Sequence, residues 1–150
     1  MFPCKLNIVT DGQWGSCGKG LVTTALASKH KPDIISTTNM ANAGHTAVWN
    51  DGNAFIAKAL PSATALTKWM DDYKPTIFIG ASAAFDIKQL LKEVQETQLE
   101  NLLVHPRAGV ITEDHKQQEN SHVSNSTKHI ASTMQGCGTF LADKVLRKQS

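Results

Sequence analysis

Cysteine is scarce in this sequence, and the positions of the few cysteines exclude two classes of small protein. Only three occur, Cys4, Cys17 and Cys137, and no Cys-x-x-Cys pair is present. This spacing argues against a disulfide framework and against a zinc site. Cys17 and Cys137 lie in glycine-rich stretches without a visible activating group, so we expect small packing residues rather than nucleophiles. The pattern fits a protein of the reducing cytoplasm.

Long apolar runs and a strong excess of charge are also absent. No apolar run reaches the length of a membrane span, and residues 1–5 do not have the pattern of a leader segment. A formal net charge of +2 is too small to indicate a nucleic-acid partner. The 150 residues, 41% of them hydrophobic, fit one globular domain over 1–150. We therefore expect no membrane and no nucleic-acid partner.

Glycine, in contrast, is concentrated in residues 11–20, which read Asp-Gly-Gln-Trp-Gly-Ser-Cys-Gly-Lys-Gly. Residues 5–10 before this stretch are apolar and β-branched enough for a strand, and residues 21–29 after it have apolar positions at helical spacing. A strand, a glycine-rich turn and a helix with Lys19 at its mouth are typical of a phosphate site. Glycines let backbone N–H groups approach phosphate oxygens, and the helix N-terminus and the lysine add positive charge.

This stretch matches neither of two common nucleotide-binding motifs. Gln13 stands where a Walker A motif has its first glycine, Gly20 replaces the magnesium-binding hydroxyl, and Gly-x-Gly-x-x-Gly is absent. The alternative is a tight strand-to-helix turn with incidental glycines. Four glycines and a lysine at one junction exceed what such a turn requires, so we interpret residues 11–20 as a phosphate loop.

The rest of the chain alternates between strand and helix patterns. This order predicts an α/β fold: a P-loop-like domain with a mainly parallel sheet flanked by helices. Strands are expected over 33–38, 76–79 and 102–104, a hairpin over 47–58 around Asp51-Gly52, a connector over 60–63, and helices over 86–98, 114–119 and 140–148. Helix 86–98 is expected to bury Ile87, Leu90, Leu91 and Val94 and to expose Lys88, Lys92, Glu93 and Glu96.

Three loops, 11–20, 39–46 and 131–138, carry the polar residues that suit chemistry. In an open α/β sheet such loops gather at the carboxyl edge of the strands, where ligands bind. His45, among small polar residues, is the best candidate for a general acid or a phosphate contact. The alternative is an exposed histidine that caps the hairpin. The other histidines are weaker candidates, including His115 in a polar, surface-like segment.

The first loop and Asn42-Ala43-Gly44-His45-Thr46 together resemble the adenylosuccinate synthetase family. Its loops read Gly-x-Gln-Trp-Gly-Asp-Glu-Gly-Lys-Gly and Asn-Ala-Gly-His-Thr. Further matches follow at Leu60-Pro61-Ser62, Pro106-Arg107-Ala108, 132–138 and 143–147, so the resemblance covers nearly the whole chain. It covers only the N-terminal part of the family's usual length. It implies a ligase that moves the γ-phosphate of ATP or GTP to the 6-oxygen of a purine nucleotide, after which L-aspartate displaces that phosphate.

The resemblance also implies roles for particular residues. Ser16, Lys19 and His45 would be catalytic, and Ser16 and the Gly44 carbonyl would bind Mg²⁺. Donor phosphates would contact Gly15, Ser16, Cys17, Gly18, Lys19, Gly20, Leu21, Gly44, His45 and Thr46. The acceptor nucleotide would contact Ser16, Asn42, Ala43, Gly44, His45, Thr133, Gln135 and Arg147. Arg147 would reach the acceptor bound by the partner in a homodimer.

One departure from the family bears on the substrate. Ser16 stands where the family has the aspartate that removes the purine N1 proton and binds Mg²⁺. Serine here is similar to the phage and archaeal PurZ-type branch, which uses dGMP and makes 2-amino-2'-deoxyadenylosuccinate. A short hydroxyl offers room and an acceptor for the guanine 2-amino group. We therefore expect dGMP as the acceptor, and water or the substrate's own groups are open choices for the missing base.

Two alternatives stay open. An IMP-dependent adenylosuccinate synthetase with an altered base would use the same loops. A nucleotide-binding module without catalysis is favoured by the absence, from residues 1–150, of the family's base-reading and aspartate-binding segments. Activity would then require a separately encoded C-terminal half.

Overall fold

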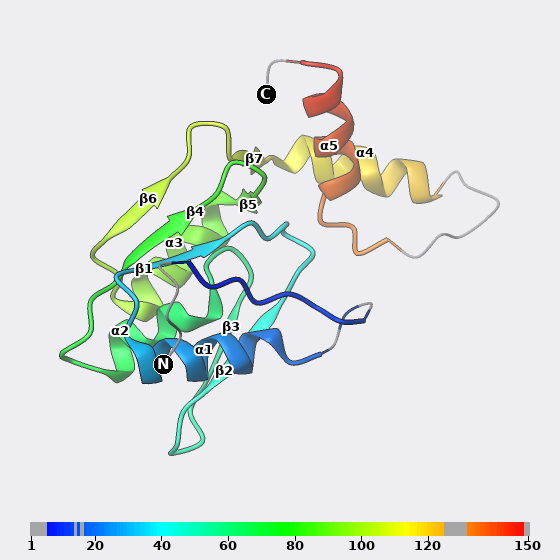
Figure 1. The fold of residues 1–150 in the computed structure, drawn as a ribbon. Helices are drawn as coiled ribbons and strands as arrows, with labels where there is room; N and C mark the ends of the chain where they lie inside the picture. The colour runs from blue at the N-terminus through cyan, green and yellow to red at the C-terminus, as the bar shows by residue number, and fades with distance from the viewer. Residues whose placement is uncertain (1–5, 14, 16, 125–131, 149–150) are drawn as a thin grey trace.

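The computed structural model describes residues 6–13, 15, 17–124 and 132–148. Along the chain the elements are α1 (Lys19–His30), β1 (Ile34–Thr37), β2 (His45–Val48), β3 (Ala54–Ala57), the 3₁₀ helix η1 (Ser62–Ala65), α2 (Leu66–Trp69), β4 (Thr76–Ile79), β5 (Ala84–Asp86), α3 (Ile87–Thr97), β6 (Leu102–Val104), β7 (Gly109–Ile111), α4 (Glu113–Ser124) and α5 (Cys137–Val145) (Figure 1). None of these helices, within the described ranges, has the length and apolarity needed to cross a bilayer.

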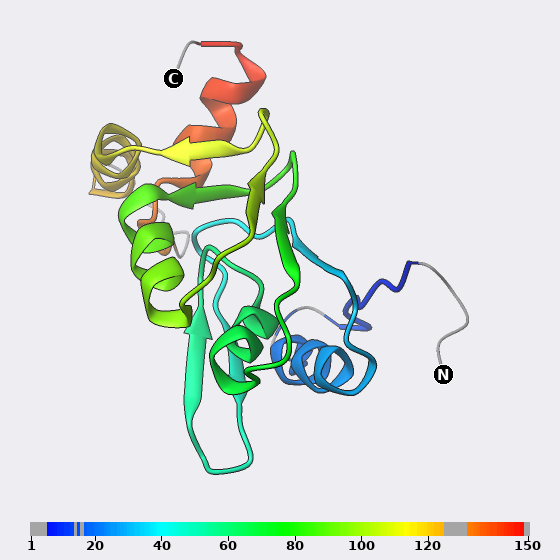
Figure 2. The same cartoon turned by 90° about the vertical axis from the view of Figure 1, so that its left-hand side faces the viewer.

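Parallel strands dominate the described part of the chain. The central sheet has the order β1-β4-β6, and β5 pairs with β7 beside it, both in parallel. The antiparallel β2–β3 hairpin extends from the sheet as a separate arm, at the opposite end from α5 (Figure 2). This arrangement confirms the predicted α/β fold with a mainly parallel sheet flanked by helices.

Most predicted elements are present, with shifts at their ends. The helix after the phosphate loop is α1, the strands at 33–38, 76–79 and 102–104 are β1, β4 and β6, and the hairpin is β2–β3. The helix expected over 114–119 is the longer α4, and the one expected over 140–148 is α5, which begins earlier, at Cys137. Strands β5 and β7 have three residues each, too few for the alternation that would have predicted them.

The strand predicted before the phosphate loop is wrong for residues 6–10. These residues have no regular secondary structure, and the side chains of Leu6 and Ile8 are 74% and 80% exposed. Apolar and β-branched residues favour a strand only where the backbone can pair with a sheet edge and the side chains can pack against a surface. In the described part of the sheet, β1 pairs with β4 alone.

The core lies between the central sheet and α3, with a second cluster beneath α1. Ile77 and Ile79 of β4 are fully buried and pack with Leu90 of α3. Beneath α1, Ala27 packs with Leu66 and its neighbours at the start of α2. The second cluster fixes α1, and therefore the mouth of the phosphate loop, to the segment that follows the hairpin.

Helix α3 is rotated relative to the prediction. Leu90 is buried and Val94 is partly buried, as expected, but Ile87 and Leu91 are 45% and 61% exposed. Glu93, expected on the outer face, is only 1% exposed. The amphipathic pattern located the helix correctly and assigned part of its inner face wrongly.

Glu93 is buried because its carboxylate satisfies the backbone after β3. It accepts hydrogen bonds from the N–H groups of Lys58 at 2.8 Å, Ala59 at 3.2 Å and Leu60 at 2.8 Å. The Gln89 side-chain amide donates a further bond at 2.8 Å. Buried carboxylates are tolerated when several donors replace their water. Glu93 therefore ties α3 to the segment that leads into η1.

We expect Glu93→Gln to lower the free energy of unfolding by about 1–3 kcal/mol, because an amide NH₂ would then face backbone donors. Urea denaturation followed by circular dichroism measures this change. Glu96→Gln, at an exposed position of the same helix, is the matched control and should leave stability nearly unchanged. Equal stability of the two variants would contradict the assigned role of Glu93.

Candidate functional site

The phosphate loop leaves the N-terminus of α1 without a capping side chain. Gly15 and Gly18 have φ of 86° and 74°, in the left-handed region that glycine adopts without strain. Gly18 is the N-cap of α1, it supplies no side-chain acceptor, and the first turn contains no acidic residue. The N–H groups that open a helix attract anions. Trp14 and Ser16 lie outside the described residues, so the roles of Ser16 stay predictions.

Lys19 and Asp11 form an ion pair at the mouth of this helix. The Lys19 Nζ atom bonds to Asp11 Oδ2, and the two side chains are 28% and 25% exposed. The other carboxylate oxygen, Asp11 Oδ1, is buried and has no hydrogen-bond partner within the part of the chain that the structure describes. The lysine predicted to hold phosphate is therefore neutralised by a carboxylate of its own loop.

Gly20 brings the first loop against the second. A Cβ atom at Gly20 would lie 2.7 Å from the backbone oxygen of Thr46 and 3.1 Å from the Cβ of His45. The Gly20 carbonyl accepts hydrogen bonds from Thr24 Oγ1 at 2.7 Å and from Ser62 Oγ at 3.0 Å. Sequence analysis missed this role of Ser62, whose signal was the Leu60-Pro61-Ser62 match interpreted as a connector.

His45 belongs to strand β2 rather than to the loop in which it was predicted, so the second loop ends at Gly44. It pairs with Ala57 across the hairpin and lies beside the Lys19–Asp11 pair. Burial is the main cause that lowers the pKa of His45, the charge of Lys19 lowers it further, and Asp11 opposes both. The imidazole is therefore neutral at neutral pH, with one nitrogen able to donate and the other to accept.

The third loop meets the second at the start of α5. Gly136, with φ of 76°, is the N-cap of α5, and its N–H group donates to the Glu119 carboxylate. Cys137 packs against Ala41, and burial raises the pKa of its thiol although hydrogen bonds with the backbone of Asn42 and Ala41 oppose this. A buried thiol with a raised pKa fits the predicted packing role.

The remaining predicted residues lie in different settings. Asn42, Gly44, Thr46 and Thr133 are exposed, and Ala43, Gln135 and Cys17 are half-buried. Leu21, in the first turn of α1, is 48% exposed. The Gln135 side-chain amide donates to the Thr133 carbonyl at 3.3 Å. Arg147 is exposed beyond the C-terminal end of α5, the opposite end from Gly136, so the structure does not bring it to the loops.

His115 was expected at the surface and is instead buried, with 4% exposure. Its Nδ1 atom accepts the Thr112 N–H at 3.0 Å, and its Nε2 atom lies 3.6 Å from Asp143 Oδ2. The ring packs edge-on against Phe140. These contacts join α4 to α5. Because the third loop leads into α5, His115 helps to fix the end of that loop.

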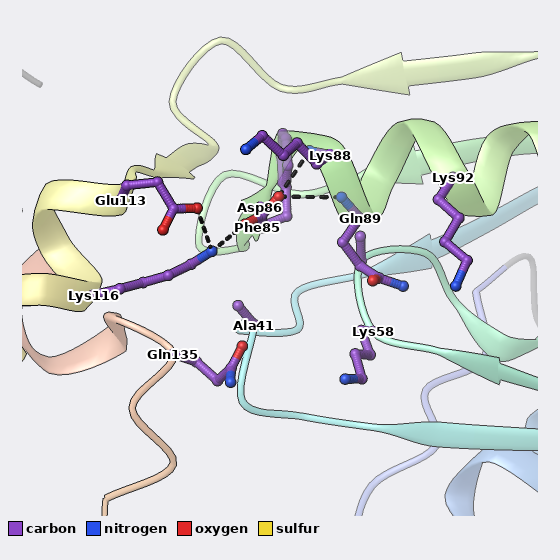
Figure 3. Close-up of a pocket in the computed structure, with 11 residues that line it drawn as sticks. Ala41, Lys58, Phe85, Asp86, Lys88, Gln89, Lys92, Glu113, Lys116 and Gln135 are labelled. Carbon is purple, nitrogen blue, oxygen red and sulfur yellow. Dashed lines mark hydrogen bonds and ion pairs between the residues drawn. The ribbon is translucent and has the colours of Figure 1, made fainter. Parts of the chain in front are cut away.

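A pocket of about 330 Å³ lies where the second and third loops approach α3 (Figure 3). Ala41 and Gln135 of these two loops line it. It is also lined by Lys58, which follows β3, and by Lys88 and Lys92 of α3. These three lysines take no ion-pair partner among the described residues. The pocket therefore has the charge to receive an anionic ligand.

A fourth lysine of the pocket is neutralised. Figure 3 shows Lys116 between Asp86 and Glu113, with Nζ–O distances of 2.5 Å and 3.0 Å. Burial acts to raise the pKa of Asp86, but the bond from Lys116 and two backbone N–H bonds from α3 outweigh it and hold this pKa below its usual range. Asp86 therefore stays ionised, caps α3 and fixes α4 beside it.

A magnesium ion has no cage of side chains here. In the described part of the chain no group of three or more His, Cys, Asp or Glu residues converges on one point. Mg²⁺ in nucleotide enzymes is held largely by phosphate oxygens and water, with one or two protein ligands. The exposed backbone of Gly44, beside the phosphate loop, fits such a shared site.

The geometry defines a class of protein. A glycine-rich loop opens a helix, a lysine occupies its first turn, and a neutral histidine on an adjoining strand faces that lysine. This combination is typical of α/β phosphate-binding domains. The family model for adenylosuccinate synthetase matches residues 8–150, and the chain belongs to this family.

Relatives of two descriptions match the chain. An N6-succino-2-amino-2'-deoxyadenylate synthase of Vibrio phage phiVC8 is 33% identical over 149 residues, covering 95% of this chain and 41% of the relative. One of Acinetobacter phage SH-Ab 15497 is 29% identical over 147 residues, with 95% and 36% coverage. An adenylosuccinate synthetase of Methanococcus maripaludis is 35% identical over 148 residues, with 94% and 41% coverage. The chain thus spans about two fifths of the relatives' length.

Two solved structures share the fold. The cyanophage S-2L succinoaminodeoxyadenylate synthetase (PurZ), bound to dGMP and dATP, superposes with a TM-score of 0.73 at 30% identity, over 92% of this chain and 37% of that one. The fully ligated adenylosuccinate synthetase of Plasmodium falciparum gives a TM-score of 0.77 at 26% identity, over 90% and 31%. The adenylosuccinate synthetase-like fold predicted from the two loops is confirmed.

We expect Gly20→Ala to destabilise the protein by about 1–3 kcal/mol, because the new Cβ would overpack the Thr46 backbone and push α1 from β2. Thermal unfolding measures the loss. Gly12→Ala is the matched control, since no atom of the described residues lies within 4 Å of a Cβ built at that position of the same loop. A Gly20→Ala variant as stable as Gly12→Ala would show that the two loops do not depend on this contact.

Proposed function

We propose that this chain supplies the phosphate-transfer part of a purine nucleotide ligase, which joins L-aspartate to C6 of the acceptor with hydrolysis of ATP or GTP. The observation that carries the proposal is the meeting of Lys19 and neutral His45 at the uncapped N-terminus of α1. The names of the phage relatives support it, and so does the solved PurZ structure, which is bound to dGMP and dATP. The setting is the cytoplasm, that of the host if the gene is viral.

Donor phosphates bind the N–H groups of residues 15–20 and the Lys19 ammonium. The Gly44 carbonyl would help to hold Mg²⁺ at this site, where the ion would supply positive charge toward the phosphates. His45 follows Gly44 in the chain and lies near Lys19. Its N–H group donates a hydrogen bond to an oxygen of the transferred phosphoryl group as negative charge develops there. The lowered pKa of His45 keeps the imidazole neutral. It can therefore donate to a phosphate oxygen without electrostatic repulsion from the Lys19 ammonium.

The acceptor is dGMP in this proposal. Serine at position 16 and the names of the phage relatives support dGMP, whereas the 35% identity with the methanococcal adenylosuccinate synthetase favours IMP as the second candidate. Asn42, Thr133 and Gln135 contact the acceptor, and the lysine-rich pocket beside Gln135 suits its anionic groups. The exposed Arg147 reaches the acceptor site of a partner in a homodimer.

A third candidate is a nucleotide-binding module without catalysis of its own. The chain covers 36% to 41% of the relatives described above, so further segments of those relatives have no counterpart in it. Catalysis would then need a separately encoded C-terminal half, and this candidate predicts nucleotide binding without turnover.

The function is tested by phosphate release with Mg²⁺, L-aspartate and ATP or GTP, comparing dGMP with IMP. The chain is assayed alone and together with the product of the adjoining downstream reading frame. Release that requires dGMP supports the proposal, and release that requires IMP supports the second candidate. Nucleotide binding without release in any mixture supports the non-catalytic module.

We expect His45→Ala to reduce phosphoryl transfer by about 10²–10⁴-fold, the usual contribution of a positioned proton donor, while nucleotide affinity changes little. Single-turnover release and equilibrium titration separate the two effects. His30→Ala, at the exposed end of α1, is the matched control. Unchanged turnover in His45→Ala would remove this residue from the mechanism.

A further inference from the structure

Asp11 is the only acidic residue in the three loops 11–20, 39–46 and 131–138. The nearest other carboxylate to a loop that the structure describes is Glu119, and the Gly136 N–H group already occupies it. Asp11 differs because one of its oxygens is buried without a donor. Its Oδ2 atom bonds to Lys19, and its Oδ1 atom is buried and has no hydrogen-bond partner among the described residues.

A buried carboxylate oxygen without a donor is costly and calls for an explanation. The charged or titratable groups that face Asp11 are Lys19 on α1 and His45 on β2. Lys19 compensates the negative charge of Asp11 but does not reach Oδ1. The vacant acceptor therefore lies beside the same two groups that the proposed function assigns to phosphate transfer.

We propose that Asp11 is the carboxylate that accepts a proton at this site. Lys19 stays paired with Asp11 until a donor phosphate binds the lysine in its place. The proposal rests on the ligase activity proposed above. Transfer of a phosphoryl group to the purine 6-oxygen requires the N1 proton to leave, and the three loops contain no other carboxylate to receive it.

The step balances with groups already named. The purine O6 forms a bond to the γ-phosphorus of the donor, and the bond from that phosphorus to the bridging oxygen breaks, which releases the nucleoside diphosphate. The N1–H electron pair becomes the second bond between N1 and C6, and the proton moves to the Asp11 carboxylate. No redox partner is needed.

The ion pair explains how one lysine serves both states. Without ligand, Lys19 and Asp11 neutralise each other inside the loop. A triphosphate carries more negative charge than a single carboxylate and also receives the N–H groups of α1, so it competes successfully for Lys19. Asp11 is thereby released as a base only when the donor is bound.

The test compares wild type with Asp11→Asn, Asp11→Glu and Asp72→Asn. Asp72 is the matched control, because it pairs with Lys31 at 2.6 Å in an exposed ion pair away from the loops. We expect Asp11→Asn to lower kcat by about 10²–10⁴-fold without raising KM for the donor, and Asp11→Glu to recover part of the loss. Asp72→Asn should behave as wild type. A wild-type kcat in Asp11→Asn overturns the proposal.

Titration of the full chain with tripolyphosphate tests the exchange without turnover. Asp11→Asn should bind it about two- to fivefold more tightly, because the part-exposed pair no longer competes for Lys19. Equal or weaker binding overturns the exchange. If wild type is inactive with every nucleotide, the ligase function and the base role fail together, and tighter binding by Asp11→Asn would still support the exchange.

Discussion

The close approach of α1 to β2 is the constraint on which the site depends. Gly20 lies against the Thr46 backbone with no room for a side chain, and its carbonyl receives hydroxyls from both α1 and η1. Thr46 follows His45 in the same strand. The contact therefore sets the spacing between a helix N-terminus and a histidine.

The electrostatics of the site follow from that spacing. Lys19 opens α1 next to Gly20, so its charge reaches His45 and contributes to the lowered pKa of the imidazole. Asp11, which is paired with Lys19, partly offsets this effect. A cation, an anion and a neutral donor thus share a small volume, and the arrival of phosphate would shift the balance among all three.

Local signals were sufficient for much of the fold. The Asp51-Gly52 turn, the glycine-rich junction before α1 and the apolar run of β4 each specify their element within a few residues, and all three are present. The three loops were also located by glycine and small polar residues, which mark positions that secondary structure avoids. Their ends were wrong, because α1, β2 and α5 each begin inside a predicted loop.

Tertiary contacts determined the features that local sequence patterns did not predict. Glu93 and His115 look like surface residues in sequence, yet both are buried. Glu93 accepts hydrogen bonds from backbone N–H groups that are distant in the chain, and His115 packs against α5. Residues 6–10 look like a strand, but they do not join any of the sheets in the described structure. The ion pair of Asp11 with Lys19 likewise depends on how the loop closes, which no periodicity encodes.

Residues 6–10, which have no regular secondary structure, lead directly into Asp11, so no strand of the described sheets anchors the entry to the phosphate loop. Its position is set instead by a contact between two side chains. Any macromolecule or segment that gave residues 6–10 a pairing partner would shift the free energy of that contact, and hence the affinity of the loop for phosphate. Thermodynamic linkage makes the effect mutual: phosphate binding would alter, by the same factor, how readily residues 6–10 join a sheet.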